Sequence, residues 1–396
     1  MNTLTQRKSY IDVLRGIVMV IMLLDHVRDF FHNSEIDPMD IEQTSLALFF
    51  TRWITHFCAP VFIFLSGVSG WLQLAKYKQK GTARFFMKRG LWFILMEWTL
   101  IAFAWTFDPG FHFIPFQVIW AIGISMLLLG VLLYVGVKDT YILILGLAIV
   151  ALHNMLDVFE AAPDFKSNFI IDLVHNGTFS AYHFAKDRVL VIVYPFMPWL
   201  GLMMVGFGMG RIFGHEQNAQ SRRKLLFALS GFCLALFVVL RAPNIYGNTS
   251  DWKTYDTFVK SLMSFLDVRK YPPSLQYMLV TIGPALFVLA LLENVENRFT
   301  KVMSVYGRTA FFFYALHIYT VHFVTMVFYF LRGHTFSELS TLENSGPFLF
   351  TVRGEGFSLP GVYLVWFCIA VALFPVCQRY DAYKRAHPEK LWLRYL

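Results

Sequence analysis

The sequence predicts an all-α, polytopic membrane helix bundle, on the basis of its composition, its long apolar runs and the placement of its basic residues. Of its 396 residues, 57% are hydrophobic and 18% are aromatic, whereas only 15% are charged. Roughly 25% of the residues in a typical soluble domain are charged. A soluble fold could not bury this much apolar surface, but a bilayer covers it. We therefore expect a single transmembrane domain over residues 1–396.

The apolar residues are gathered in runs of the length that a membrane helix needs. A helix crosses the hydrocarbon core with about 20 predominantly apolar residues. We therefore expect about ten transmembrane helices, at 10–31, 46–75, 84–106, 112–136, 140–158, 188–213, 224–243, 274–293, 303–330 and 358–378.

The basic residues predict how these helices are oriented. Cytoplasmic segments of membrane proteins carry an excess of Lys and Arg. With the N-terminus in the cytoplasm, more than half of the 34 Lys and Arg residues fall on the inner side, although the outer segments are longer. We therefore expect both termini to be cytoplasmic, with outer segments at 32–45, 159–187, 244–273 and 331–357. This topology also accounts for the net charge of +8, so no nucleic-acid partner is expected.

The common cofactor and catalytic motifs are missing from the sequence. The four cysteines form no CxxC pair, and the chain has no Walker loop, GxGxxG fingerprint, HExxH motif or GxSxG element. We therefore expect no metal site and no disulfide framework.

The first apolar run carries ionisable residues, which are costly in a membrane and therefore indicate function. Arg15 lies near its inner end, whereas Asp25, His26, Arg28 and Asp29 lie near its outer end. Eleven residues of helix turn about 20° past three full turns and rise about 16 Å, so Arg15 and His26 share one face. Asp29, three residues after His26, is a candidate to orient the imidazole. Alternatively, the three charged neighbours of His26 simply end the helix among the headgroups.

Other polar side chains lie at a similar depth in the membrane, and we expect them to face one polar cavity. The candidates to bind a substrate there are Arg28, Arg52, His56, Glu97, Lys270 and His317. For any one of them, an ordinary interhelical hydrogen bond is the alternative.

A second group of cations lies near the inner surface. Arg15, Arg89 and Arg308 each lie next to a glycine, within a predicted helix or at its mouth. They are candidates to bind a phosphorylated cofactor from the cytoplasm through charge-assisted hydrogen bonds. Ordinary anchoring by positive charge at the inner surface is the alternative.

Several stretches resemble bacterial membrane proteins that carry the heparan-alpha-glucosaminide N-acetyltransferase catalytic domain. The resemblance runs over most of the chain and is most specific in the first of these stretches. They are YIDVLRGIVMVIMLLDHVRDFFH from Tyr10, FTRWITHFCAPVFIFLSG from Phe50, RGLW from Arg89, YPFMPWLG from Tyr194 and KYPPS from Lys270.

This resemblance implies a transmembrane acyltransferase in a bacterial inner membrane, with acyl-CoA on the cytoplasmic side and the acceptor on the outer side. The spacing of Arg15 and His26 also resembles the arginine–histidine motif of the related acyltransferase-3 family, which implies that His26 is catalytic. In lysosomal members, an Asn matches His26 and the essential His follows later. His32 is therefore a second candidate for the catalytic residue.

Together, these observations predict transfer of an acyl group, most simply acetyl from acetyl-CoA, to a sugar or glycan at the outer face. His26 or His32, oriented by Asp25 or Asp29, would deprotonate the acceptor or carry the acyl group itself. The expected partners are acyl-CoA, the glycan and the lipid bilayer, and a homo-dimer is left open. A proton-coupled small-solute transporter is the alternative, because intramembrane His, Asp and Arg relays also suit that class. A purely structural membrane protein would not need so many buried charges.

The predicted topology can be tested directly with reporter fusions. Reporters placed after Lys80, after Ser221 and at the C-terminus should all give a cytoplasmic signal, because Lys and Arg concentrate in these segments. An external signal at any of the three positions would contradict the ten-helix topology.

Overall fold

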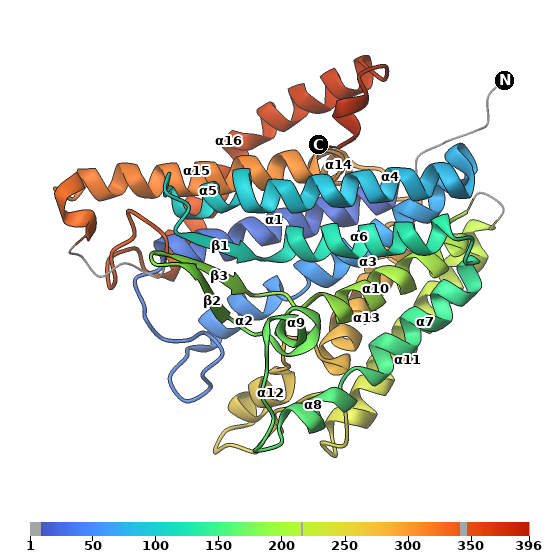
Figure 1. Ribbon diagram of the computed structural model, residues 1–396, viewed down its shortest axis with the longest axis horizontal. Coiled ribbons are helices and arrows are strands. Elements are labelled where there is room, and N and C mark those ends of the chain that lie inside the picture. The colour runs from blue at the N-terminus through green and yellow to red at the C-terminus, as the bar shows by residue number, and fades with distance from the viewer. Residues whose placement is uncertain (1–8, 215–216, 341–346, 396) are drawn as a thin grey trace.

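The computed structural model describes residues 9–214, 217–340 and 347–395, and in it one helix forms the centre of a bundle (Figure 1). This central helix is α1 (Ser9–Phe31), most of whose residues are buried. The helices that pack against it are α2 (Leu46–Thr55), α3 (Cys58–Leu72), α13 (Leu275–Leu292), α14 (Arg298–Arg308), α15 (Ala310–Leu331) and α16 (Leu359–Ala386).

The remaining long helices surround this centre. The chain passes from α4 (Leu74–Met96) through one π-helical turn (Glu97–Ile101) into α5 (Ala102–Thr106), and α4 packs along α6 (Val118–Tyr134). Next to α3 and α6 lies α10 (Phe196–Met209), which also contacts α7 (Asp139–Leu152), while α11 (Ala219–Arg241) packs on α13. The shorter elements are α8 (Met155–Glu160), α9 (Phe169–Ile171), α12 (Phe258–Leu266), a π-helical turn (Asp172–Asn176) and 3₁₀ turns at Gly210–Phe213, Phe336–Ser340 and Leu391–Arg394.

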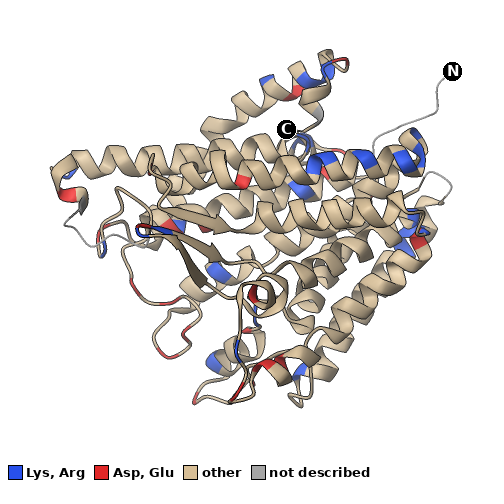
Figure 2. Cartoon of the chain, viewed as in Figure 1, with Lys and Arg blue, Asp and Glu red and all other residues tan. Residues whose placement is uncertain are grey.

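Seven helical segments in the described part of the chain are long and apolar enough to cross a membrane. They are Leu46–Leu72, Asp139–Glu160, Phe196–Phe213, Ala219–Arg241, Leu275–Leu292, Ala310–Leu331 and Leu359–Ala386. The count of ten stays a prediction. α1 and α4 carry too many charged residues to be counted among the seven, and α6, with 17 residues, is shorter than the others. In Figure 2, Lys and Arg gather near the start of α4 and the end of α16, whereas many acidic residues lie in loops at the opposite end. The side on which the termini lie also stays a prediction.

A three-stranded sheet corrects the expectation of a purely α-helical chain. Its strands are β1 (Phe113–Phe116), β2 (Ser180–Ala185) and β3 (Arg188–Ile192), in the order β1-β3-β2. β1 runs parallel to β3, and β2 antiparallel to it. The predicted helices at 112–136 and 188–213 therefore begin as strands. Pro115, which has no N–H to donate in a helix, is accommodated because β1 is an edge strand.

The predicted helix at 303–330 is also interrupted. α14 ends at Arg308 and α15 begins at Ala310, with Thr309 outside helical geometry between them. The apolar pattern is continuous across this break, so periodicity alone does not reveal it.

Two glycines let α1 and α14 approach until their backbones touch. A Cβ atom added to Gly16 would lie 1.8 Å from the carbonyl oxygen of Met303, and one added to Gly307 would lie 1.8 Å from that of Asp12. Small residues commonly permit such close crossings between membrane helices. The glycines beside Arg15 and Arg308 are therefore explained by packing.

Arg241, at the end of α11, organises the long segment between α11 and α13. Its side chain is 1% exposed. It donates hydrogen bonds to the backbone carbonyls of Ser250, Ser264, Phe265 and Asp267, at 2.7–3.0 Å. The planar guanidinium thus satisfies four buried acceptors at once.

Replacement of Arg241 should destabilise the protein far more than replacement of an exposed arginine on the same helix. Arg241→Met leaves buried carbonyls without donors, at a cost on the order of 3 kcal/mol. The matched control is Arg223→Met, because Arg223 is exposed on α11. Thermal unfolding in detergent should show a lower Tm for Arg241→Met alone, and equal losses in the two variants would contradict this role.

Candidate functional site

His26 lies buried near the C-terminal end of α1, inside a cage of aromatic rings. Its imidazole stacks on that of His317 from α15, with ring centroids 5.0 Å apart. Trp105 of α5 meets it edge-on at 4.8 Å, and Tyr314 lies 6.1 Å away. The structure thus brings together His26 and His317, which the sequence predicted separately, and adds Trp105, which no sequence pattern indicated.

A chain of hydrogen bonds fixes the proton on His26. His317 Nδ1 lies 2.7 Å from the carbonyl oxygen of Phe313, which only accepts, so Nδ1 must carry a proton. In neutral His317, Nε2 is then an acceptor, and His26 Nδ1 donates to it at 2.7 Å. The Nε2 atom of His26 therefore carries a lone pair, and it has no hydrogen-bond partner among the described residues. A base placed in this way is available to a reacting group.

The carboxylates predicted to orient His26 contact arginines instead. Asp25 forms ion pairs with Arg28 at 3.0 Å and with Arg52 at 2.9 Å. Asp29 also pairs with Arg28 and makes no described hydrogen bond to His26. The expectation that Asp29 fixes the tautomer is therefore wrong in this structure, where the imidazole of His317 does so.

His32 borders a polar pocket of about 430 Å³ at the outer end of α1. Burial lowers the pKa of His32, and the positive charge of Arg28 lowers it further. Its Nδ1 atom accepts a long hydrogen bond of 3.4 Å from the backbone N–H of Ser34. The charged and titratable residues around the pocket are Arg28, Asp29, His32, Glu35, Arg353 and Glu355.

His56 and Lys270 lie near the ion pairs around Asp25. Both His56 and Lys270 interact electrostatically with Asp25, and Lys270 also acts on His26. The Nδ1 atom of His56 is buried without a hydrogen-bond partner among the described residues, and the Lys270 ammonium lies 5.0 Å from the centre of the Tyr271 ring. Residues of α1, α2 and the turn before α13 thus lie near one another, whereas a single polar cavity shared by all six predicted residues stays a prediction, since of the six only Arg28 lines the polar pocket.

Glu97 lies at the π-helical turn between α4 and α5, and such turns are frequent at functional sites. One of its carboxylate oxygens accepts the backbone N–H of Trp120 at 2.9 Å. The other is buried without a described partner. Four more polar atoms nearby are also buried without a described hydrogen-bond partner. They lie on α4, the π-helical turn and α6, and are Arg89 Nε, Trp92 Nε1, Trp98 Nε1 and Trp120 Nε1.

The three inner arginines differ in how they are neutralised. Arg15 donates to Asp12 at 2.9 Å and to Ser69 at 2.8 Å. Arg308 forms a bidentate pair with Asp381, at 2.8 and 2.7 Å. Helix spacing offers Asp12 as a partner of Arg15, whereas nothing in the sequence links Arg308 to Asp381.

Arg89 has no carboxylate partner among the described residues. Its guanidinium instead lies over the rings of Phe85 and Phe93, at 5.8 and 5.0 Å. The positive charge of Arg15 also acts on it. Of the three arginines, Arg89 therefore has the greatest need of an external anion.

Comparison with known proteins assigns the family. Residues 7–239 match the model of the catalytic region of heparan-alpha-glucosaminide N-acetyltransferase. The chain belongs to this family. It is therefore an integral membrane acetyltransferase by family, in accord with its apolar helices.

No curated protein matches the chain at a significant level. The family match ends within α11, so Lys270, Arg308 and His317 lie beyond it. The histidine that orients His26 thus comes from the part of the chain outside the matched region.

Proposed function

We propose that this family member transfers an acetyl group from acetyl-CoA, bound from the cytoplasmic side, to a hydroxyl or amine of a sugar at the outer side. The observation that carries the proposal is the free Nε2 lone pair of His26, which His317 and the Phe313 carbonyl orient. His26 lies on the same helix as Arg15, and His32, which directly follows this helix, borders the polar pocket.

The donor would enter beside Arg89, whose charge no described carboxylate balances. Phosphate groups pair well with guanidinium groups. Along α4 and α6, the unpaired buried groups that include Glu97 Oε1 and the Trp98 indole suit the amides of a pantetheine arm. The axial rise of about 16 Å between Arg15 and His26 is comparable to the length of that arm.

In the chemical step, His26 Nε2 takes the proton of the acceptor hydroxyl or amine as the acceptor attacks the thioester carbonyl. The C–S bond then breaks, and the imidazolium returns its proton to the departing thiolate. The positive charge on His26 is stabilised because its Nδ1–H donates to His317 Nε2. A route through an acetyl-histidine would use the same nitrogen.

The hydrogen-bond chain gives less support to a proton-coupled transporter. A relay needs a group that both accepts and releases a proton at each end. Here the chain from His26 through His317 ends on the backbone carbonyl of Phe313, which cannot pass a proton onward.

Acetyl-CoA should stabilise the protein through Arg89. Millimolar acetyl-CoA is expected to raise the Tm, because a ligand that binds only the folded state stabilises it. Arg89→Gln should reduce this rise, whereas Arg223→Gln at the same surface should not. Arg15 is a poorer test because its contacts with Asp12 and Ser69 also support packing. An unchanged rise in Arg89→Gln would contradict the proposed donor site.

Replacement of His26 should abolish acetyl transfer without removing acetyl-CoA binding. With glucosamine as acceptor and release of the CoA thiol as readout, we expect no transfer by His26→Ala. His317→Ala should lower kcat by about 10²–10⁴-fold and shift the pH profile, because the tautomer of His26 is no longer fixed. Asp29→Asn should have a smaller effect. Near-normal turnover by His26→Ala, with loss in His32→Ala, would move the catalytic role to His32.

A further inference from the structure

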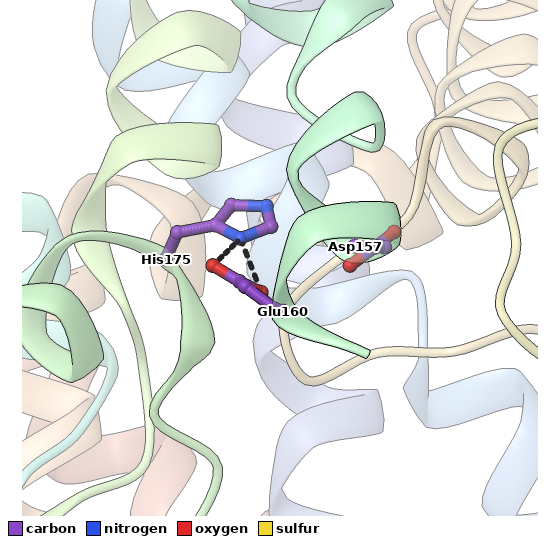
Figure 3. A group of neighbouring side chains, drawn as sticks. All are labelled: Asp157, Glu160 and His175. Carbon is purple, nitrogen blue, oxygen red and sulfur yellow. Dashed lines mark hydrogen bonds and ion pairs between the residues drawn. The ribbon is translucent and has the colours of Figure 1, made fainter. Parts of the chain in front are cut away.

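A second cluster of titratable side chains lies away from His26, at the outer ends of α7 and α8 (Figure 3). Glu160 and Asp157 come from α8, and His175 comes from the π-helical turn at Asp172–Asn176. Their candidate ligand atoms all lie within 4.8 Å of one another. Figure 3 shows the imidazole of His175 facing the carboxylate of Glu160, with Asp157 to one side on the same helix.

No lysine or arginine balances the two carboxylates of this cluster among the described residues, and His175 is the one basic side chain beside them. His175 Nδ1 lies 2.8 Å from Glu160, whose side chain is 11% exposed, and the His175 side chain is 2% exposed. No Lys or Arg in the described part of the chain forms an ion pair with Asp157 or Glu160. Asp157 and Glu160 are half-buried, so a cation beside their two carboxylates would offset a charge that water only partly screens.

His153 supplies the second interaction that a metal-binding histidine usually makes. Its Nδ1 atom lies 3.1 Å from Nε2 of His175, and the side chain of His153 is buried. With the proton of His175 on Nε2 and donated to His153, the Nδ1 lone pair faces the two carboxylates. Metal-ligating histidines almost always donate their other ring N–H in this way, which fixes the tautomer and the ring orientation.

We propose that Asp157, Glu160 and His175 bind one divalent transition-metal ion of the zinc or manganese class. One imidazole and two carboxylates suit these ions, and two carboxylates neutralise a divalent charge. Water completes the coordination. The site does not depend on the acetyl-transfer chemistry proposed above.

The ion would brace the turn that carries Lys270 and Tyr271. Thr178, close after His175 in the chain, donates to the carbonyl of Tyr271 at 2.9 Å. On the other flank, Asn154 donates to Asp157 at 2.7 Å and accepts the backbone N–H of Leu275 at 2.8 Å. Both flanks of the turn next to the His26 site are thus tied to the metal-binding segments.

The proposal is tested by metal content in full-length, tag-free protein. After EDTA treatment, incubation with Zn²⁺ or Mn²⁺ and gel filtration, mass spectrometry should find about one bound ion per chain. Glu160→Gln and Asp157→Asn should bind at least tenfold more weakly, as expected when a ligand is lost. Asp164→Asn, in the exposed loop after α8, is the matched control and should bind like the wild type.

Thermal unfolding separates a metal site from a simple ion pair. The metal should raise the Tm of the wild type and of Asp164→Asn, with reversal by EDTA, but not that of Glu160→Gln. Absence of retained metal in the wild type, or equal retention in Glu160→Gln, would overturn the proposal. In that case the cluster would be a protonated His175 paired with Glu160.

Discussion

The hydrogen bond between His26 and His317 is the interaction on which the candidate site depends. Two neutral imidazoles can bond in only one direction once a carbonyl has fixed the proton on one of them. The carbonyl of Phe313 fixes the proton of His317 on Nδ1. His317 Nε2 then accepts from His26 Nδ1, which leaves the lone pair of His26 on Nε2. The arrangement requires α1 and α15 to lie side by side deep in the bundle. It therefore explains why a helix that carries several charged residues lies at the centre of the bundle.

Burial of charge shapes the rest of the bundle. Asp25, Arg28 and Arg52 form a network at the C-terminal end of α1, while Arg308 and Asp381 pair near its N-terminal end. Breaking such a pair leaves an uncompensated charge, which costs far more than an exposed ion pair contributes. Arg89 departs from this pattern because it rests on aromatic rings. An arginine that lies on aromatic rings and has no described carboxylate partner is a candidate to bind an anionic ligand.

The sequence predicts the bundle and most of the residues at its polar centre, but not their partners. Apolar runs and costly intramembrane charges locate His26, His317 and Arg52, because burial rules apply to each residue separately. The partners of His26 and Arg308 lie far away in the chain, and no spacing rule brings them together. Asp29 was favoured as the partner of His26 because it is near in sequence. A nearby arginine competes more strongly for its carboxylate. The sequence does not reveal the sheet, because β1 and β3 lie at the starts of long apolar runs and β2 lies in a predicted loop.

The contact between Gly16 and Gly307 limits how the protein can move. Because the backbones of α1 and α14 touch, rotation or sliding of α1 alone would drive the carbonyl of Met303 or Asp12 into the backbone of the other helix. The helix that carries both Arg15 and His26 is therefore fixed in position relative to α14. A rocking movement of the kind that many transporters use would therefore have to carry α1 and α14 together as one unit.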